Sequence, residues 1–504
     1  MLVALPVLLP LFAAGLGLLT SRVRHAQRVV SIVVLTVVIA DAAALLALVD
    51  DRGTVVLRLG GYQPPAGITL VADRLSALML LVSSVVTLVV LLYALGQRVS
   101  DYGPTATTSF HPVYLVLSAG VMLAYLTGDL FTLFVAFELM LTASYVLITR
   151  GVTADRVRAA MTYVIVGLTS SLLFITLIAL VYAAAGTVNL ADLGEKLAGI
   201  DAGMRDALSL LFVTVIGIKA AVVPLHFWLP DSYPNAPAPV TAVFAGLLTK
   251  VGVYALIRVQ TVVFAHQQAW QVLLVAALVT MLVGALGAVA QDDVNRMLSF
   301  LLVSHIGFML FGLGLFSQAG LTGAILYALH HITVQAALFL VLGMVTRHTG
   351  EMSLRRMPGG LAHQRPGLAV LYAIGAVNLA GLPPLSGFLA KVALLRGGTA
   401  NEAELGTVLA GAAVATSFVT LYALARVWVI AFWGESDDQT DAGSRRPSPR
   451  AAMPRLMTAS CAVLIGAGVA MAVFAGPLSA VADRAAAGAL DVASYRSAVL
   501  GGER

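Results

Sequence analysis

Three of the four lysines in the chain lie inside long apolar segments, where a charged side chain is costly. They are Lys219 in VTVIGIKAAVVP, Lys250 in FAGLLTKVGVY and Lys391 in LSGFLAKVALL. An acidic residue, Glu138, has the same setting in LFTLFVAFELMLTASYVLI. A charge at the centre of a bilayer costs roughly 2.5–3.5 kcal/mol on insertion scales, so such residues usually pair, line a hydrated path or titrate.

A buried acid beside buried amines is suited to moving protons. Burial favours the neutral form of a lysine, whereas a nearby carboxylate favours its charged form. At ~4 Å and an effective dielectric constant of ~20, the pair is worth ~4 kcal/mol. Making and breaking a contact between Glu138 and a lysine would therefore switch that lysine between holding and releasing a proton. The alternative is that each lysine only snorkels or holds a static ion pair.

Two adjacent histidines add a second kind of titratable group. The segment ILYALHHITVQAALF places His330 and His331 between two of the buried lysines along the chain. Histidine changes charge near neutral pH, so either ring could pass a proton. The alternative is a histidine that only forms a hydrogen bond inside a helix bundle. We also predict that His226 and Asp231, in a proline-rich stretch, lie at the cytoplasmic mouth of the proton path.

Other chemistries lack their motifs. The sequence has no GxxxxGK[ST] loop, no HExxH and no CxxC, and its one cysteine, Cys461, lies in an apolar run. No acidic residue, cysteine or further histidine lies close in sequence to His330 and His331. We therefore predict no metal site and no cofactor, and we expect an ion gradient or a partner protein to supply the energy.

These residues must be positioned by membrane-spanning helices. The chain has 504 residues, of which 60% are hydrophobic and 11% charged, against about 25% charged in an average soluble domain. Its mean hydropathy is +0.95. These values exclude a soluble enzyme, a disulfide-rich secreted protein and a nucleic-acid-binding protein. The predicted fold class is an all-α polytopic membrane protein.

A helix of about 20 apolar residues crosses the hydrocarbon core. By this rule we predict 14 transmembrane segments. They cover residues 2–20, 29–49, 75–96, 112–128, 130–148, 158–186, 207–228, 238–260, 270–290, 296–316, 320–346, 366–396, 404–432 and 455–478.

Two of these segments are interrupted by proline and glycine. The break in VVPLHFWLPDSYPNAPAP begins at Pro224, and AGLPPLSGF contains Gly381, Pro383 and Pro384 in mid-span. Proline removes a helix hydrogen bond, and freed backbone at membrane depth is tolerated only beside protein, a cavity or water. Two breaks in corresponding places predict two inverted repeats of five helices with an ion path between them. Simple packing kinks are the alternative.

The predicted organisation has four parts. Residues 1–111 form three helices with an external hairpin loop, 112–260 the first repeat, 261–432 the second, and 433–504 a cytoplasmic linker, a last helix and an external tail. Both termini are predicted to lie outside, because the loops that are then cytoplasmic hold more Arg and Lys.

Three polar stretches lie between or after the segments. Residues 50–74 alternate in hydropathy around a Gly-Gly turn, which predicts the external hairpin. Residues 435–454 have the composition of a flexible linker. The alanine-rich tail after residue 478 is expected to form an interfacial helix.

Four stretches resemble signature sequences of the D-type component of Mrp-type multisubunit cation/proton antiporters. They are FVAFELMLTASYVLITRG, KAAVVPLHFWLPDSYPNAPAPVTAVFAGLLTKVGVYALIR, HHITVQAALFL and AGLPPLSGFLAK, and the likeness covers about residues 70–430. The wider superfamily includes the antiporter-like proton-pumping subunits of respiratory complex I and of membrane-bound hydrogenases. The resemblance implies fourteen helices, two inverted five-helix repeats and external termini.

The resemblance also implies roles for individual residues. The family's acid–lysine pair matches Glu138 and Lys219, and its central relay lysine matches Lys250. The lysine of its second broken helix matches Lys391, and its connecting histidines match His330 and His331. At one position the chain departs from the family, because Gln335 stands where a lysine is common. Since Gln carries no charge, a relay step there must fall to the histidines or to water.

The sequence therefore predicts a proton-translocating subunit of an antiporter that exchanges a monovalent cation, expected to be Na⁺, for protons. Its predicted partners are the other subunits of a hetero-oligomeric complex, protons, monovalent cations and membrane lipid, and no nucleic acid. The predicted location is a bacterial-type cell membrane. Two alternatives stay open: a proton-pumping subunit of a redox complex, and a membrane scaffold whose buried charges are inert.

Overall fold

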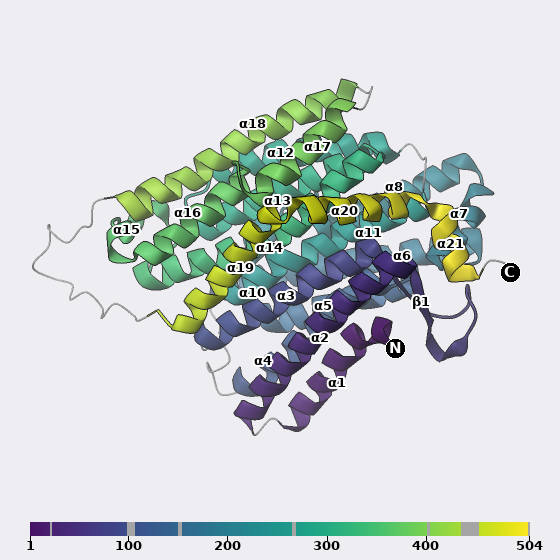
Figure 1. Cartoon of the computed structure of the whole chain (residues 1–504), viewed down its shortest axis with the longest axis horizontal. Coiled ribbons are helices and arrows are strands. Elements are labelled where there is room, and N and C mark those ends of the chain that lie inside the picture. Colours follow the sequence, from purple (N-terminus) through teal and green to yellow (C-terminus); the bar gives the residue numbers. More distant parts are fainter. Residues whose placement is uncertain are drawn as a thin grey trace, which may run out of the picture.

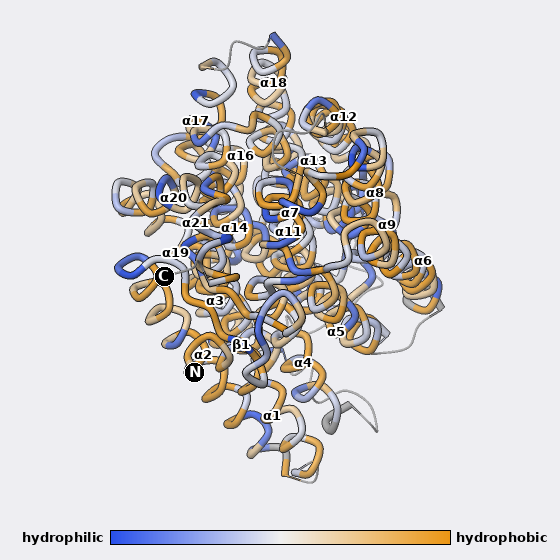
Figure 2. Tube along the Cα trace, turned by 90° about the vertical axis from the view of Figure 1, so that its right-hand side faces the viewer, coloured by the Kyte–Doolittle hydropathy of each residue, from blue (hydrophilic) through white to orange (hydrophobic). Residues whose placement is uncertain are grey.

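The computed structural model describes residues 1–20, 23–97, 106–149, 154–264, 269–400, 404–434 and 453–501. Helices dominate this part of the chain and run side by side along the long axis of the molecule (Figure 1). Twelve of them are long and apolar enough to cross a membrane. Figure 2 looks along the bundle and shows mostly hydrophobic tubes with short hydrophilic interruptions. The predicted fold class, an all-α polytopic membrane protein, is confirmed.

The N-terminal half contains the elements up to Val262. They are η1 (Leu2–Ala4), α1 (Leu5–Leu19), α2 (Arg24–Arg52), β1 (Val55–Arg58), η2 (Leu59–Gly61), β2 (Thr69–Ala72), α3 (Arg74–Gln97), α4 (Ala106–Leu126), α5 (Leu130–Ile148), α6 (Ala154–Ala185), α7 (Leu190–Ala198), α8 (Ala202–Ala220), α9 (Trp228–Ser232), η4 (Tyr233–Asn235), α10 (Ala238–Val243), the π-helix η5 (Phe244–Leu248) and α11 (Thr249–Val262).

The C-terminal half contains the remaining elements. They are α12 (Ala269–Val289), α13 (Val294–Gly314), α14 (Gln318–Thr349), η6 (Leu354–Arg356), α15 (Leu361–Gln364), α16 (Pro366–Ala380), α17 (Ser386–Ala400), α18 (Glu404–Val427), the π-helix η7 (Trp428–Trp433), α19 (Arg455–Val473), α20 (Ala475–Leu490) and α21 (Val492–Leu500).

Helices occupy each of the fourteen ranges predicted from hydropathy. The two predicted ranges that are absent from the twelve apolar spans, 207–228 and 366–396, are the two that contain a break. The count of fourteen membrane crossings and the two inverted repeats therefore stay predictions. The predicted linker 435–454 lies outside the described residues except for its last two positions.

Both breaks close with the same backbone hydrogen bonds. The residue that follows α8, Ala221, and the residue that follows α16, Gly381, both have the left-handed conformation. In each case the backbone N–H of the next residue donates to the carbonyl five positions earlier. Val222 donates to Gly217 over 2.9 Å, and Leu382 donates to Val377 over 3.1 Å. This is a Schellman motif, which satisfies helix-end carbonyls where a helix stops. Pro224, Pro383 and Pro384 lie in the turns that follow, as the sequence predicts.

The predicted hairpin is present, and it lies at the same end as both termini. β1 pairs antiparallel with β2 in the register Val55↔Ala72 to Arg58↔Thr69. The N-terminal turn η1 and the C-terminal helix α21 both pack against the hairpin, as Figure 1 also shows. The termini therefore share one side of the bundle, and the assignment of that side to the cell exterior stays a prediction.

One helix forms the centre of the molecule. Every residue of the most apolar stretch of α14 is buried, and α14 packs against α3, α10, α13, α16, α17, α19 and α20. α20 continues from α19 and packs along α14 and α3, so the tail after residue 478 is helical. The polar residues inside this stretch, His330, His331 and Gln335 among them, are therefore enclosed by protein.

Candidate functional site

The first buried lysine lies at the end of the first broken helix. Lys219 is in the last turn of α8, and its Nζ lies 5.0 Å from the centre of the Phe137 ring on α5. The Nζ donates a hydrogen bond of 3.4 Å to Ser171 Oγ on α6. The side chain is therefore held between three helices by an aromatic face and one hydroxyl.

The same hydroxyl joins this lysine to the predicted acid. Ser171 Oγ donates a short hydrogen bond to the carboxylate of Glu138 on α5. A hydroxyl has one proton to donate and lone pairs to accept, so Ser171 can bond both groups at once. The predicted pair of Glu138 and Lys219 is thus brought together through a serine. This arrangement can pass a proton, because the hydroxyl accepts from the amine side and donates to the acid side.

A cavity of about 30 Å³ adjoins this group. Such a volume holds only one or two water-sized molecules. Its wall is largely aromatic and apolar, with Lys219 and Ser170 as polar members. The remaining lining residues are Phe137, Met140, Leu141, Tyr163, Val166, Gly167, Ile218, Trp228, Tyr233 and Leu248.

The second lysine, Lys250, is fully buried in α11, one residue after its start. Its Nζ donates a short hydrogen bond to the carbonyl of Ala245 in the preceding π-helix η5. Single π-turns inside α-helices are frequent at functional sites, because they loosen the regular hydrogen-bond ladder. A Cβ on the next residue, Gly246, would lie 3.4 Å from the carbonyl oxygen of Ile332. The peptide that binds Lys250 therefore packs against α14 at Ile332, the residue after His331.

Three buried histidines lie close together, one of which the sequence analysis did not single out. The ring of His305, on α13, lies 5.0 Å from the ring of His331 on α14, measured between centroids. His305 Nδ1 lies 3.0 Å from the hydroxyl of Tyr327. Among the described residues, neither ring nitrogen of His331 has a hydrogen-bond partner. His331 can therefore accept or donate a proton without first losing a bond to the protein.

His330 points instead toward the second broken helix. Its Nδ1 lies 3.0 Å from Ser386 Oγ at the start of α17. Ser386 in turn donates to Asn378 Oδ1 over 3.1 Å, and the backbone N–H of Gly387 donates to the same oxygen over 2.9 Å. A Cβ at Gly387 would clash with the Asn378 carbonyl and lie 3.0 Å from the His330 ring, so only glycine fits there. His330 is thus tied to the two halves of the break.

The third lysine bridges that break. Lys391 Nζ, on α17, donates to the carbonyl of Ala380, the last residue of α16, over 2.7 Å. It also donates to Ser417 Oγ on α18 over 2.8 Å, and it lies 5.0 Å from the centre of the Phe308 ring. Cations are favoured at a helix C-terminus, where the carbonyls lack helical partners.

A cavity of about 260 Å³ reaches this lysine. Ala380, Ser417 and Phe308, which surround the Nζ, all line it. Most of the other lining residues are apolar, and Val414 and Phe418 at its edge are exposed on the surface of the bundle. Lys391 is therefore buried from the bulk but next to a space that opens sideways between α17 and α18.

Gln335, the position at which the chain departs from the family, is fully buried. Its Nε2 donates to the carbonyl of Leu298 over 3.0 Å. In the part of the chain that the structure describes, its Oε1 has no partner. An amide that is fixed at one end can orient a neighbour but cannot carry a charge.

The predicted mouth lies at the first break. Asp231, on α9, forms an ion pair of 2.9 Å with Arg296 of α13, and both side chains are over two-fifths exposed. The His226 ring packs edge-on against Phe300, with centroids 6.3 Å apart. Pro224 and Phe227, on either side of His226, are exposed. Both predicted mouth residues therefore lie near the surface of the bundle.

The described residues hold no group of three or more His, Cys, Asp or Glu that could bind a metal ion. The residues that sequence reasoning missed are His305, Ser171, Ser417, Ser386 and Asn378. His305 carried the same signal as His330, a histidine in an apolar segment. The serines and the asparagine carried none, because such residues are common in membrane helices.

Comparisons with known proteins identify the family. The family described as NADH:quinone oxidoreductase/Mrp antiporter, transmembrane, matches residues 127–420, which is more than half of the chain. The chain belongs to the NADH:quinone oxidoreductase/Mrp antiporter family. The match contains Glu138, the three buried lysines and the histidines of the site.

Two members of this family share long stretches of sequence with the chain. The D component of the Na(+)/H(+) antiporter of Alkalihalophilus pseudofirmus is 41% identical over 437 residues, which cover 86% of this chain and 87% of that protein. The D component of the Na(+)/H(+) antiporter of Bacillus subtilis is 35% identical over 502 residues, or 99% of each chain. These proteins are named as antiporter subunits and not as enzymes, which agrees with the antiporter subunit predicted from the sequence.

Solved structures give the same assignment. A chain in the structure of the Mrp complex from Dietzia sp. DQ12-45-1b superimposes with a TM-score of 0.90 at 33% identity, and 99% of each chain is covered. A chain of the membrane-bound sulfane sulfur reductase, an archaeal respiratory membrane complex, superimposes with a TM-score of 0.86 at 23% identity over 99% of each chain. The second likeness concerns the fold alone.

Proposed function

We propose that this chain is the proton-translocating subunit of a multisubunit antiporter that exchanges a monovalent cation, expected to be Na⁺, for protons. The observation that carries the proposal is the bridge from Lys219 through Ser171 to Glu138 within an antiporter-family fold. A lysine, a hydroxyl and a carboxylate in one hydrogen-bonded row are the parts that a proton switch needs.

The proposed path continues through the centre of the bundle. Protons enter near His226 and Asp231 and reach Lys250. They then pass the cluster of His305, His330 and His331. They reach Lys391 through the second break. Two contacts support this order: η5 packs on α14 beside His331, and His330 bonds to Ser386 next to the second break. Between Lys219 and Lys250 the link is through helix packing, since Gly252 of α11 lies against Ala220 of α8.

Two further features of the proposal concern architecture. Residues 112–260 and 261–432 are proposed to be inverted repeats, with 1–111 and 433–504 outside them. Support comes from local geometry that recurs in both. Asp129, the N-cap of α5, forms an isolated β-bridge with Asn189. Asp293, the N-cap of α13, forms one with Ser353, and in both cases the partner lies 60 residues further along the chain. The Schellman motifs at Ala221 and Gly381 recur in the same way.

The proposed partners are the other subunits of the complex, and the proposed location is the cell membrane with both termini outside. Membrane potential acts on a moving charge at about 2.3 kcal/mol per 100 mV, which is enough to bias the Glu138 switch. Na⁺ itself need not cross beside these lysines, because like charges repel.

The test is cation-dependent ΔpH transport by the whole complex in everted membrane vesicles, with Na⁺, K⁺ and Li⁺ compared. The Lys250→Met variant removes the central amine and keeps the chain length of the side chain. We expect exchange to be lost at unchanged assembly. The matched control is Lys196→Met, since Lys196 is exposed in α7 and lies outside the path. Undiminished exchange in Lys250→Met would leave the chain as a scaffold for other subunits.

A further inference from the structure

A polar cleft of about 300 Å³ lies at the end of the molecule that carries the hairpin and the termini. It is formed where α2 and α20 end and α3 and α21 begin. Its charged lining residues are Asp73, Arg74, Arg484 and Asp491, and Ser494 and Tyr495 add hydroxyls. We call it the hairpin-side cleft.

The walls of the hairpin-side cleft are held by charged pairs. Asp50, at the end of α2, accepts bonds of 2.7 Å from both Arg74 of α3 and Arg484 of α20. The carboxylate of Asp50 has two guanidinium partners, so losing one leaves the other in place. These arginines are partly exposed, which keeps the cleft polar and accessible.

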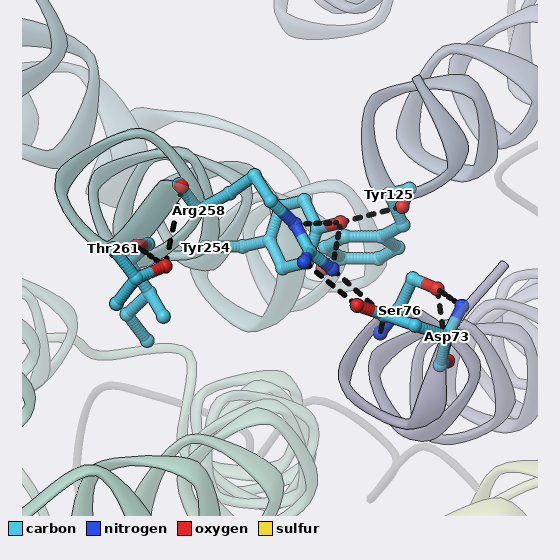
Figure 3. A network of polar contacts seen from close by, with 7 residues as sticks. Asp73, Ser76, Tyr125, Tyr254, Arg258 and Thr261 are labelled. Atoms are coloured by element: carbon cyan, nitrogen blue, oxygen red, sulfur yellow. Dashed lines mark hydrogen bonds and ion pairs between the residues drawn. The ribbon is translucent and has the colours of Figure 1, made fainter. Parts of the chain in front are cut away.

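One lining residue of the cleft, Asp73, belongs to the buried ion pair shown in Figure 3. The two carboxylate oxygens of Asp73 lie 2.7 Å from the two terminal nitrogens of the Arg258 guanidinium. Arg258 belongs to α11 and is only 3% exposed. Burial alone raises the pKa of Asp73, but the charge of Arg258 and the bonds from Ser76 outweigh it and hold the pKa below its ordinary value. The ionised form of Asp73 is therefore favoured.

Two tyrosines enclose the guanidinium. Its Cζ lies 5.5 Å from the centre of the Tyr254 ring, on the same helix, and 5.2 Å from the centre of the Tyr495 ring, on α21. Tyr254 donates to the carbonyl of Tyr125 over 2.6 Å and thus fixes α11 to α4. Aromatic faces hold a cation by its charge. Arg258 is accordingly fixed from both sides between the cleft and the interior.

The position of Arg258 relative to Lys250 gives this pair a further meaning. Lys250, Tyr254 and Arg258 follow one another at intervals of four residues, so they lie on one face of α11. At 1.5 Å per residue Arg258 lies about 12 Å from Lys250 along the helix axis. Lys250 points away from the cleft, toward Ala245 in the preceding turn. An ion pair thus stands between the relay lysine and the hairpin-side cleft, with Asp73 facing the cleft and the guanidinium of Arg258 behind it, on the helix of the lysine.

We propose that Arg258, held by Asp73, is an electrostatic seal that stops protons and monovalent cations from passing between the hairpin-side cleft and Lys250. A fixed arginine is a barrier of this kind, because its charge repels a proton or cation in a narrow, weakly polar passage. With the seal in place, the polar cleft can end close to Lys250 without a leak of protons or cations between the two. This inference rests on the proposed function, in which Lys250 carries protons.

The test is proton leak through the assembled complex in everted vesicles, measured as decay of an imposed ΔpH in medium without Na⁺, K⁺ or Li⁺. The variant combines Arg258→Gln with Asp73→Asn, since two amides keep a hydrogen-bonded, similarly sized pair without charge. We expect the ΔpH to decay about tenfold faster, which corresponds to a barrier lowered by about 1.4 kcal/mol. The control is Arg484→Gln, which neutralises an arginine of the same cleft outside the seal.

Adding Lys250→Met to the paired variant identifies the inner end of the leak. Suppression of the leak by Lys250→Met supports the seal as stated. A paired variant that assembles and stays tight overturns it, and so does a leak that Lys250→Met leaves unchanged. If the paired variant fails to assemble, Arg258→Lys, which keeps the charge, and Arg258→Met with Asp73→Leu, which keeps the packing, replace it. Equal tightness of these two overturns the seal. Exchange in the Lys250→Met single variant tests the proposed function separately.

Discussion

Lys219 and Lys391 each lie next to a helix break, but Lys219 precedes the first break and Lys391 follows the second. Lys219 is in the last turn before the first break, whereas Lys391 follows the second break and reaches back to its first half. Each amine has an aromatic ring 5.0 Å away and a serine hydroxyl as acceptor. The two lysines therefore have the same kinds of neighbour at first sight.

The two sites differ in the group that accepts the hydrogen bond from each serine hydroxyl. Ser171 donates to the carboxylate of Glu138, which is a titratable group. Ser417 donates to the backbone carbonyl of Ala413 over 2.7 Å, and a peptide carbonyl does not take up a proton. Lys391 has a second neutral acceptor in Ala380. The first site can change its charge through its neighbour, and the second has only fixed dipoles.

The cavities differ in the same sense. About 30 Å³ adjoin Lys219, and about 260 Å³ adjoin Lys391. A tight site with an acid suits a switch, and a roomy site with fixed acceptors suits exchange with a neighbouring medium or protein. Under the proposed function, the site at Lys219 in the first half of the chain controls when a proton moves, and the site at Lys391 in the second half transfers it onward.

The comparison breaks if only one of the two lysines is needed. We expect Lys219→Ala and Lys391→Ala each to reduce cation-dependent ΔpH transport by about 100-fold or more, the usual scale for losing a proton-transfer group. Transport would be measured in everted vesicles at matched levels of assembled complex. Lys196→Ala serves as the control. Exchange at wild-type level in either variant would remove that lysine from the path.

Neutralising the acid tests the difference directly. Glu138→Gln keeps the size of the side chain and an acceptor for Ser171 but removes the negative charge. We expect exchange to fall by about 10- to 100-fold, since one charge pair in this setting is worth a few kcal/mol. Glu138→Asp keeps the charge and is expected to retain more exchange than Glu138→Gln. Equal rates for both variants would show that the charge of Glu138 does not set the switch.

More of the fold than of the site could be predicted from the sequence. Hydropathy located helices over all fourteen predicted ranges, because each must bury about 20 apolar residues or face lipid. Proline and glycine located both breaks, and the Gly-Gly turn located the hairpin. The course of α20 along α14 did not follow, since it depends on packing between segments that are far apart in sequence.

Within the site, the sequence revealed residues whose type is costly in an apolar segment. The lysines, Glu138 and His330 were found in this way, and His305 could have been. Ser171 and Ser417 could not, because a serine in a membrane helix usually bonds to its own helix and looks ordinary. The pair of Asp73 and Arg258 joins residues 185 positions apart, and no local pattern marks it.

Exchanging the residues that close the two breaks sharpens the comparison. Gly381 has φ +85°, and a Cβ there would lie 2.6 Å from Lys391 Cδ. The equivalent Ala221 already carries a Cβ at φ 60°. We expect Gly381→Ala to lower exchange about tenfold, because a left-handed alanine costs about 1–2 kcal/mol before any clash. Ala221→Gly is the matched control and is expected to retain exchange. Loss in the control alone would reverse this ranking.

The smallest expected effect separates the two serines. Ser171→Ala removes the bridge between Lys219 and Glu138, and a single hydrogen bond is worth about 0.5–1.5 kcal/mol, so exchange is expected to fall about 3- to 10-fold. Ser417→Ala leaves Lys391 bonded to Ala380 and is expected to cost less. Thr169→Val is the matched control, because Thr169 is exposed on the same helix and its hydroxyl donates to the carbonyl of Ile165 over 2.9 Å, outside the site. If Ser417→Ala costs more than Ser171→Ala, the second lysine depends on its hydroxyl more than the first, and the division of roles between the two breaks is wrong.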